Sequence, residues 1–137
     1  MYAAEFDYVR ASSIEEAISL KGANDDSSLL AGGHSLIPAM KLRLSTPQKL
    51  IDISGLDQLK NISKNGSYIS IGALCTHKQC AESDIIQSNC PALSDAASVI
   101  GDPHVRNKGT LGGALAHSDP QADYPGVVLA LNATIIV

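Results

Sequence analysis

The chain has 137 residues, 45% of them hydrophobic, which is enough for one compact domain with a core and too few for two ordinary domains. With 14 acidic against 10 basic side chains the formal charge is -4, and no Lys/Arg cluster stands out, which argues against nucleic acid as a partner. No apolar run approaches the ~18 to 20 residues of a membrane span, and no signal-peptide pattern opens the chain, so a cytoplasmic protein with no membrane span is expected.

The first third alternates strand-like and helix-like segments. Residues 8–11 predict a strand, and Ser12 with Glu15 predicts a capping box for a helix that Gly22 closes. The expected apolar stripe of this helix is Ile14, Ala17 and Ile18.

A second strand and helix follow directly. Residues 29–31 predict a short buried strand, after which Ser35 is expected to cap a helix with Pro38 in its first turn. Residues 50–53 predict a third strand. Strands separated by helices indicate right-handed crossovers and a small, mainly parallel βαβ sheet.

The pattern then changes to an antiparallel one. Asn65-Gly66 lies between the strand-like residues 61–63 and 68–71, as in a two-residue hairpin turn, and Ile69 and Ile71 share one face. The expected fold class is therefore α+β with two lobes. The first lobe covers residues 1–56, and the second covers residues 57–137 with an antiparallel sheet and helices.

Helical signals dominate the second lobe up to Gly101. Thr76 with Gln79 predicts a capped helix, and residues 91–100 repeat apolar positions at helical spacing. Glycine, proline, Asp and Asn crowd residues 101–125, which predicts an ordered functional loop rather than a regular element.

A short helix is expected to start at Pro125, and residues 133–137 predict a final β-strand. A bare apolar edge strand is an unusual place for a domain to stop, so the fold is expected to be incomplete at its C-terminus. The alternative is an inner strand that ends the fold.

No metal site or catalytic residue is predicted. The odd number of cysteines has no zinc or iron–sulfur spacing, and reduced, mostly buried thiols are expected. The histidines are too scattered for a metal centre and are expected in loops or on the surface, at positions 34, 77, 104 and 117. Ser118 is near His117 only in sequence, so no nucleophile–base pair is assigned.

Two glycine-rich segments predict binding of a dinucleotide diphosphate. In residues 31–35 a Gly-Gly pair links a strand to a helix, where exposed amides attract anions. Taken alone, this Gly-Gly pair is explained as well by plain turn chemistry. In residues 109–120 a second Gly-Gly pair is expected to expose amides, and Thr110 and Ser118 add hydroxyls. Two such loops from two lobes suit a long ligand in a cleft.

Asp123 has two open interpretations. Its carboxylate could accept a hydrogen bond from a ribose or ribityl hydroxyl, or it could be a helix N-cap ahead of Tyr124 and Pro125.

These segments resemble the FAD-binding motifs of the medium, or flavoprotein, subunit of carbon monoxide dehydrogenase and related molybdenum hydroxylases. That family includes xanthine dehydrogenases and 4-hydroxybenzoyl-CoA reductase. The similarity runs from end to end in motif order, through residues 31–36, 71–73, 100–113, 116–120 and 123–125. Ala114 stands where the family often has Asn, so one polar contact near the flavin is expected to be missing.

The resemblance implies a two-lobed FAD-binding PCMH-type domain and FAD as cofactor. The residues it implies for FAD binding are Ala31, Gly32, Gly33, His34, Ser35, Leu36, Gly101, Gly109, Thr110, Leu111, Gly112, Gly113, Ala114, Ser118 and Asp123. It also implies an oxidoreductase complex in which a small subunit carries two [2Fe-2S] clusters and a large subunit carries molybdopterin. The flavin would pass electrons to an external acceptor.

Relatives of this family continue past the end of this chain, so a separately encoded remainder of the subunit is a further expected partner. One alternative is a cofactor-free fragment that acts only by docking to another subunit. Another is a generic nucleotide-phosphate binder, which would bind ADP and FAD with comparable affinity.

Overall fold

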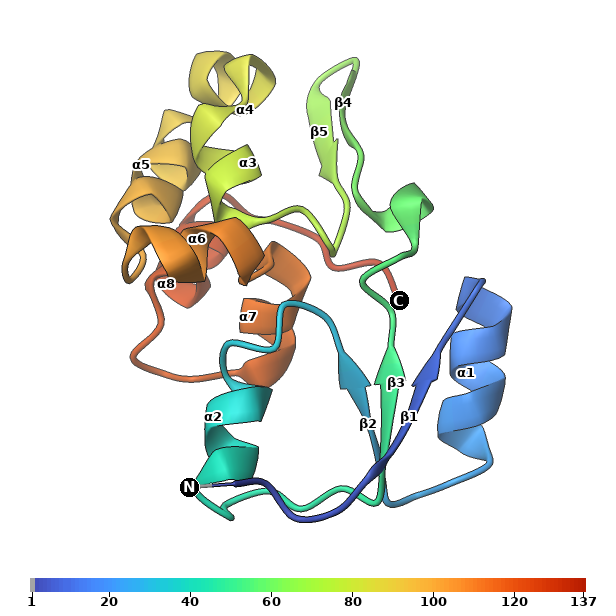
Figure 1. Cartoon of the computed structure of the whole chain (residues 1–137). Coiled ribbons are helices and arrows are strands. Elements are labelled where there is room, and N and C mark those ends of the chain that lie inside the picture. The colour runs from blue at the N-terminus through green and yellow to red at the C-terminus, as the bar shows by residue number, and fades with distance from the viewer. Residues whose placement is uncertain (1) are drawn as a thin grey trace. The chain divides into compact units, whose positions relative to one another are not determined.

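The structure is a computed structural model that describes residues 2–137 (Figure 1). The chain divides into two compact units, the first ending at Gln58 and the second beginning at Leu59. Each unit has its own sheet and its own cluster of buried side chains. The fold class is α+β, as predicted, with one parallel and one antiparallel sheet.

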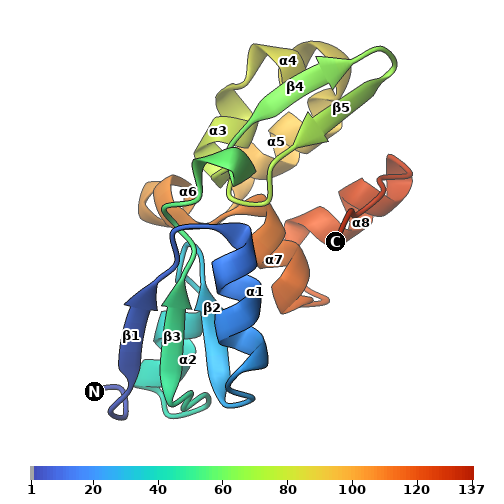
Figure 2. The same cartoon turned by 90° about the vertical axis from the view of Figure 1, so that its right-hand side faces the viewer.

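The first unit is a parallel three-stranded sheet with one helix on each face. Its elements are β1 (Asp7–Arg10), α1 (Ile14–Gly22), β2 (Ser27–Leu30), α2 (Leu36–Lys41) and β3 (Lys49–Asp52). The strand order is β1-β3-β2, with Ile51 of the central strand opposite Val9 and Leu29. Figures 1 and 2 show α1 and α2 on opposite faces of this sheet. The three predicted strands are confirmed to within a few residues.

Helix α1 differs from its prediction at the cap and in its apolar stripe. The N-cap is Ser13, whose side chain accepts from the amide of Glu16 at 3.1 Å, so the predicted Ser12–Glu15 pair is wrong by one residue. Ala17 is buried in a cluster with Ala11 and Ile51. Ile18, by contrast, is 66% exposed, because it lies outside the face that contacts this small sheet.

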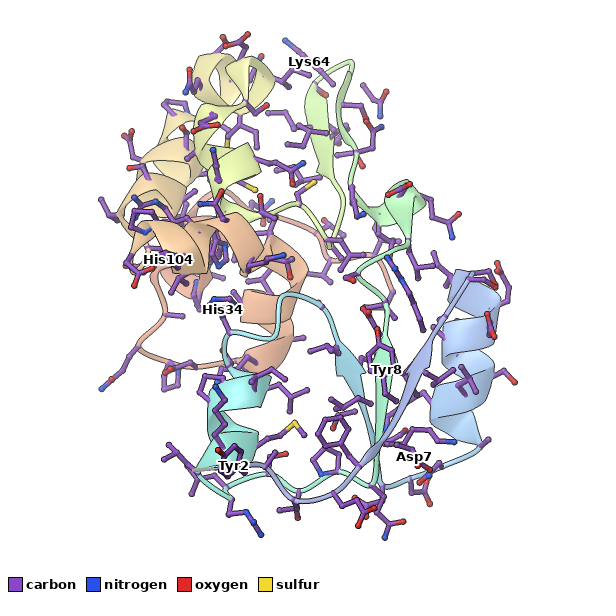
Figure 3. The ribbon with its side chains drawn as sticks, viewed as in Figure 1. Tyr2, Asp7, Tyr8, His34, Lys64 and His104 are labelled. Atoms are coloured by element: carbon purple, nitrogen blue, oxygen red, sulfur yellow. The ribbon has the colours of Figure 1, made fainter. Side chains whose placement is uncertain are left out.

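Side-chain hydrogen bonds link Asp52, the last residue of β3, to Tyr8 of β1 and to the Ser54 amide. The Tyr8 hydroxyl donates to the buried Asp52 carboxylate at 2.5 Å, and the Ser54 amide donates to its other oxygen at 2.8 Å. Burial opposes ionisation of Asp52, but these hydrogen bonds outweigh it and lower the pKa of the carboxyl group. Figure 3 labels Tyr8, which projects from β1.

The second unit begins with a hairpin. The 3-10 helix η1 (Asp57–Leu59) leads into β4 (Ile62–Asn65) and β5 (Tyr68–Ile71), which pair antiparallel. The predicted hairpin is confirmed, but its two-residue loop is Gly66-Ser67, because Asn65 still pairs with Tyr68. Gly66 has a φ of +61°, the conformation that a first loop residue needs and that glycine adopts without strain.

Helices complete the second unit: α3 (His77–Glu82), α4 (Asp84–Asn89), α5 (Pro91–Val99), α6 (Pro103–Lys108), α7 (Leu111–His117) and α8 (Asp123–Ala130). The predicted capping box of Thr76 with Gln79 is present at the start of α3. The predicted helix over 91–100 is confirmed as α5. No helix among residues 2–137 combines the length and the apolar character that crossing a bilayer requires.

Two predictions for the last third of the chain are wrong. Residues 101–125 are not a single loop but contain α6, α7 and the start of α8, since Asp102 and Thr110 each cap a helix despite the many glycines. Residues 133–137 form no strand, because a strand needs a hydrogen-bonded neighbour and none of the described residues pairs with them.

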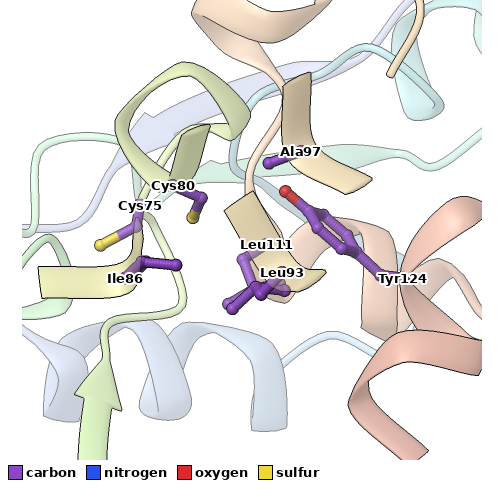
Figure 4. Close-up of a cluster of buried hydrophobic side chains, with 7 residues drawn as sticks. All are labelled: Cys75, Cys80, Ile86, Leu93, Ala97, Leu111 and Tyr124. Atoms are coloured by element: carbon purple, nitrogen blue, oxygen red, sulfur yellow. The ribbon is translucent and has the colours of Figure 1, made fainter. Parts of the chain in front are cut away.

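The core of the second unit is a cluster of buried apolar side chains (Figure 4). It consists of Cys75, Cys80, Ile86, Leu93, Ala97, Leu111 and Tyr124. Tyr124 of α8 is the largest fully buried side chain, and Figure 4 shows its ring beside Leu93 and Ala97 of α5. The prediction of mostly buried, free thiols is confirmed for Cys75 and Cys80, while Cys90 is half-buried.

Candidate functional site

The first glycine-rich segment is a sharp turn between β2 and α2. Gly33 has a φ of +73°, in the left-handed region where a side chain is strained. A Cβ atom there would also lie 3.0 Å from Ile37 Cγ1 and 3.2 Å from Leu30 Cδ1. Gly33 is therefore required by the turn itself.

This turn leaves backbone donors without a protein partner. Within residues 2–137, the amides of Gly33, His34 and Ser35 donate to no backbone or side-chain acceptor. The His34 ring holds its own position through Nδ1, which lies 3.0 Å from the Gly32 carbonyl oxygen, and the ring is exposed (Figure 3). Adjacent amides with no internal acceptor are suited to an anionic group such as a phosphate.

Ser35 does not cap α2 with its side chain, which corrects its prediction. The helix begins at Leu36, but Ser35 has helical backbone angles, φ -104° and ψ -48°, and its side chain makes no capping bond. An N-cap side chain reaches the first-turn amides from an extended backbone, which Ser35 does not have. Its exposed hydroxyl is thus not used for the cap.

The second glycine-rich segment, residues 109–120, contains α7, whose first turn packs on residues 73–77. The amides of Leu111 and Gly112 each donate at 2.9 Å, to the carbonyl oxygens of Cys75 and Ala73. The Gly113 amide donates to the Thr110 hydroxyl at 3.1 Å. The expectation that this Gly-Gly pair offers free amides is therefore wrong, because all three donors are satisfied inside the unit.

The glycines of this segment are explained by close packing. A Cβ atom on Gly112 would lie 2.6 Å from Ala73 Cβ and 2.7 Å from the Ala73 carbonyl oxygen. One on Gly109 would lie 2.5 Å from His77 Nε2. All three distances are shorter than real Cβ contacts. Only glycine at these two positions therefore lets the segment pack this closely on residues 73–77.

The hydroxyls predicted to contact a ligand have internal roles. Thr110 is buried and its hydroxyl is the α7 cap. Ser118, at the C-cap of the same helix, donates from its hydroxyl to the Leu115 carbonyl at 3.0 Å and has a φ of +55°. Each hydroxyl keeps acceptor capacity, so contact with a ligand stays a prediction.

Gly101 precedes α6, and Ala114 lies in the middle of α7. Gly101 has a φ of +47°, and its carbonyl accepts from the Arg106 guanidinium at 3.3 Å. Ala114 is half-buried and packs against the core cluster of the second unit.

At the start of α6, the hydrogen bond from the Val105 amide lowers the pKa of the Asp102 carboxyl group.

Of the two interpretations of Asp123, the N-cap is not observed. The N-cap of α8 is Ala122, and Asp123 is the first helical residue. Its side chain is exposed and makes no hydrogen bond within the described residues. The carboxylate therefore remains available to accept from a ligand hydroxyl.

Sequence reasoning missed a buried polar pair beside this segment. His77 was predicted to be in a loop or on the surface, but it is 5% exposed, and its Nδ1 lies 3.0 Å from the Tyr124 hydroxyl oxygen. The signal that could have revealed it is its position next to the Thr76 cap, at the first residue of an amphipathic helix. His34, His104 and His117 are exposed, as predicted. No group of metal-binding side chains was found among residues 2–137.

Burial also perturbs the ionisable groups around this pair. Burial raises the pKa of Cys80 to about 12, with a smaller contribution from Cys75. Burial likewise raises the pKa of Tyr124, so its phenol stays protonated near neutral pH.

Comparison with known proteins covers nearly the whole chain. Residues 4–137 match the family described as the FAD binding domain in molybdopterin dehydrogenase. The glyceraldehyde dehydrogenase medium chain of Sulfolobus acidocaldarius is 45% identical over 137 residues, which is 100% of this chain and 49% of that protein. The xanthine dehydrogenase FAD-binding subunit of Escherichia coli O157:H7 is 33% identical, over 93% of this chain and 44% of its own.

A solved structure is similar over the same range. The carbon monoxide dehydrogenase from Hydrogenophaga pseudoflava that lacks the Mo-pyranopterin moiety matches with a TM-score of 0.93 and 44% identity. The match covers 95% of this chain and 46% of that one. The chain thus spans about half the length of the curated relatives it matches.

Proposed function

Because the chain belongs to the family of FAD-binding domains of molybdopterin dehydrogenases, whose cofactor is FAD, we propose that it is the FAD-holding part of a molybdenum hydroxylase flavoprotein subunit. The observation that carries the proposal is the family match over residues 4–137, which includes both glycine-rich segments. The alternative, a cofactor-free docking module, is not favoured, because the match to the FAD-binding family includes both glycine-rich segments.

The first segment is suited to the diphosphate of FAD. The amides of Gly33, His34 and Ser35 have no acceptor in the chain, and Gly33 keeps side-chain atoms away from them. In the proposal, residues Ala31 to Leu36 bind the diphosphate with these amides as donors.

The second segment has a different proposed role. Its amides at Leu111, Gly112 and Gly113 are occupied, so its contribution to FAD binding is a closely packed backbone surface rather than a set of free donors. Proposed contacts in this region are Gly101, Gly109, Thr110, Leu111, Gly112, Gly113, Ala114 and Ser118. Asp123, with its exposed carboxylate, is proposed to accept from a ribose or ribityl hydroxyl.

A bound flavin supplies the redox chemistry, accepting electrons and releasing them to an acceptor. The residues named above bind and orient it and perform no covalent step. Several relatives are medium chains or FAD-binding subunits by name. By analogy, the proposed partners are an iron–sulfur small subunit and a molybdopterin large subunit, and the proposed activity is electron transfer from the [2Fe-2S] clusters to an external acceptor, in the cytoplasm.

The test is a titration of the purified protein with FAD, followed by the visible absorbance of the flavin, with ADP as competitor. The proposal predicts saturable binding of FAD that is tighter than that of ADP, because ADP lacks the ribityl chain and the isoalloxazine ring and so offers fewer groups to the proposed contacts. Comparable affinity for ADP and FAD would support a generic nucleotide binder instead. Absence of binding, with and without the partner subunits, would overturn the proposal.

A further inference from the structure

His77 of α3 lies between two segments that are proposed to contact FAD. Its backbone amide donates to the Gly109 carbonyl at 3.0 Å, and its ring edge at Nε2 faces Gly109 so closely that a Cβ atom there would be 2.5 Å away. The opposite side of the ring, at Nδ1, lies 3.0 Å from the Tyr124 hydroxyl oxygen. One imidazole thus contacts Gly109 and the residue that follows Asp123.

The surroundings of the ring hold it in one place. The His77 and Tyr124 ring centroids are 5.3 Å apart, with their planes tilted by 56°. The two residues are 5% and 0% exposed. The helix that carries His77 is anchored by the Thr76–Gln79 capping box, and Thr76 also pairs with Thr110 through an isolated β-bridge. His77 therefore has little freedom to move independently of the start of α7.

The hydrogen-bonded pair places polar atoms beside a core cluster whose members other than Tyr124 have apolar or thiol side chains. Apolar rings of similar volume would fill the space without the cost of burying polar atoms. A satisfied buried hydrogen bond instead fixes one relative arrangement of the groups that make it. The pair is thus suited to setting position rather than to adding stability.

We propose that His77 and Tyr124 are positioning residues for FAD, whose mutual hydrogen bond holds the Gly109–Gly113 segment and Asp123 in the register that the cofactor requires. This inference rests on the proposed function, since it assigns those segments to FAD. Neither residue is proposed to touch the cofactor. Their effect passes through Gly109 on one side and through the start of α8 on the other.

The test compares Tyr124→Phe, which removes only the hydroxyl, with His77→Phe, the double variant and Ile86→Val. Ile86 is a fully buried member of the same cluster and serves as the control for lost packing. Each single variant is expected to weaken FAD binding by up to about tenfold, the upper end of the net contribution of one hydrogen bond. The double variant is expected to bind FAD about as weakly as Tyr124→Phe alone, because Tyr124→Phe already removes the hydrogen bond between the two rings. Ile86→Val is expected to keep the wild-type dissociation constant within about twofold.

A second readout does not depend on FAD. Hydrogen exchange at residues 109–113 of the flavin-free protein should be faster in Tyr124→Phe than in wild type, and unchanged in Ile86→Val. The positioning role is overturned if the two ring variants alter neither this exchange nor FAD affinity more than Ile86→Val does. If the exchange changes as expected but wild type itself binds no FAD, the proposed function fails while the link between the two rings and this segment stands.

Discussion

Single glycines in this chain are required for two different physical reasons. Gly33 adopts a positive φ, whereas Gly109 and Gly112 lie where a Cβ atom would overlap His77 and Ala73. A substitution at the first position strains the backbone, and one at the others pushes two packed segments apart. The consequences for FAD binding should differ accordingly.

Gly33→Ala should weaken FAD binding by about tenfold or more, because a left-handed alanine costs roughly 1–2 kcal/mol and the turn can relax only by moving its unpaired amides. The measurement is an FAD titration, with urea unfolding to confirm that the variant is folded. Gly22→Ala is the matched control, since a Cβ atom there meets nothing within 4 Å. Equal affinity of Gly33→Ala and wild type would remove this turn from the site.

The reactivity of the three cysteine thiols should show which of them are buried in the core of the second unit. With a pKa of about 12, about one Cys80 thiol in ten thousand is ionised at pH 8, and the side chain is fully buried. Ellman's reagent should therefore label half-buried Cys90 well before Cys80 or Cys75, and all three in urea. Mass spectrometry of the labelled peptides distinguishes the sites. Labelling of native Cys80 as fast as Cys90 would contradict the buried position.

Among the secondary-structure elements, α7 connects local capping with the proposed site. Its N-cap Thr110 accepts from the Gly113 amide, and its first two amides donate to Cys75 and Ala73. The helix start is therefore stabilised both by its own cap and by a distant segment. Loss of the cap alone should loosen the segment without releasing it.

Thr110→Ala should cost about 0.5–2 kcal/mol of stability, the usual range for an N-cap, and should also weaken FAD binding. Ser13→Ala is the matched control, because it removes a cap of the same 3.1 Å length from α1. The control should lose similar stability and bind FAD like wild type. Urea unfolding and FAD titration of both variants make the comparison. Parallel losses of affinity in both would show that the effect is general destabilisation.

For the whole molecule, the relevant fact is that two compact units each have a core of their own. A ligand that binds only the folded chain adds to its free energy of unfolding in proportion to the logarithm of its concentration. A ligand that contacts residues of both units adds to the stability of both.

Saturation with FAD at about 100 times its dissociation constant should therefore add about 2.7 kcal/mol to the free energy of unfolding. Hydrogen exchange should slow in β3 of the first unit and in α5 of the second. Protection in one unit alone would show that the proposed contacts from the other unit do not form. The same measurements with ADP at the same concentrations control for weak binding of phosphate groups.

The sequence by itself determined the elements whose signals are local. The strands at 7–10 and 49–52, the hairpin around Gly66, the Thr76–Gln79 cap and the helix at 91–99 were all predictable, because each depends on residues within a few positions of one another. The family resemblance also needed only the sequence. The caps at Asp102 and Thr110 were local signals too, but the glycine-rich composition around them favoured a loop.

Only the tertiary structure decided what those elements do at the site. The acceptor of the Gly112 amide is the Ala73 carbonyl, and the partner of His77 is Tyr124, and both lie far away in the sequence. No periodicity or spacing encodes such pairs, since they form only when segments that are distant in the sequence pack together. For the same reason, the amides of the first glycine pair remain available while those of the second are used within the fold.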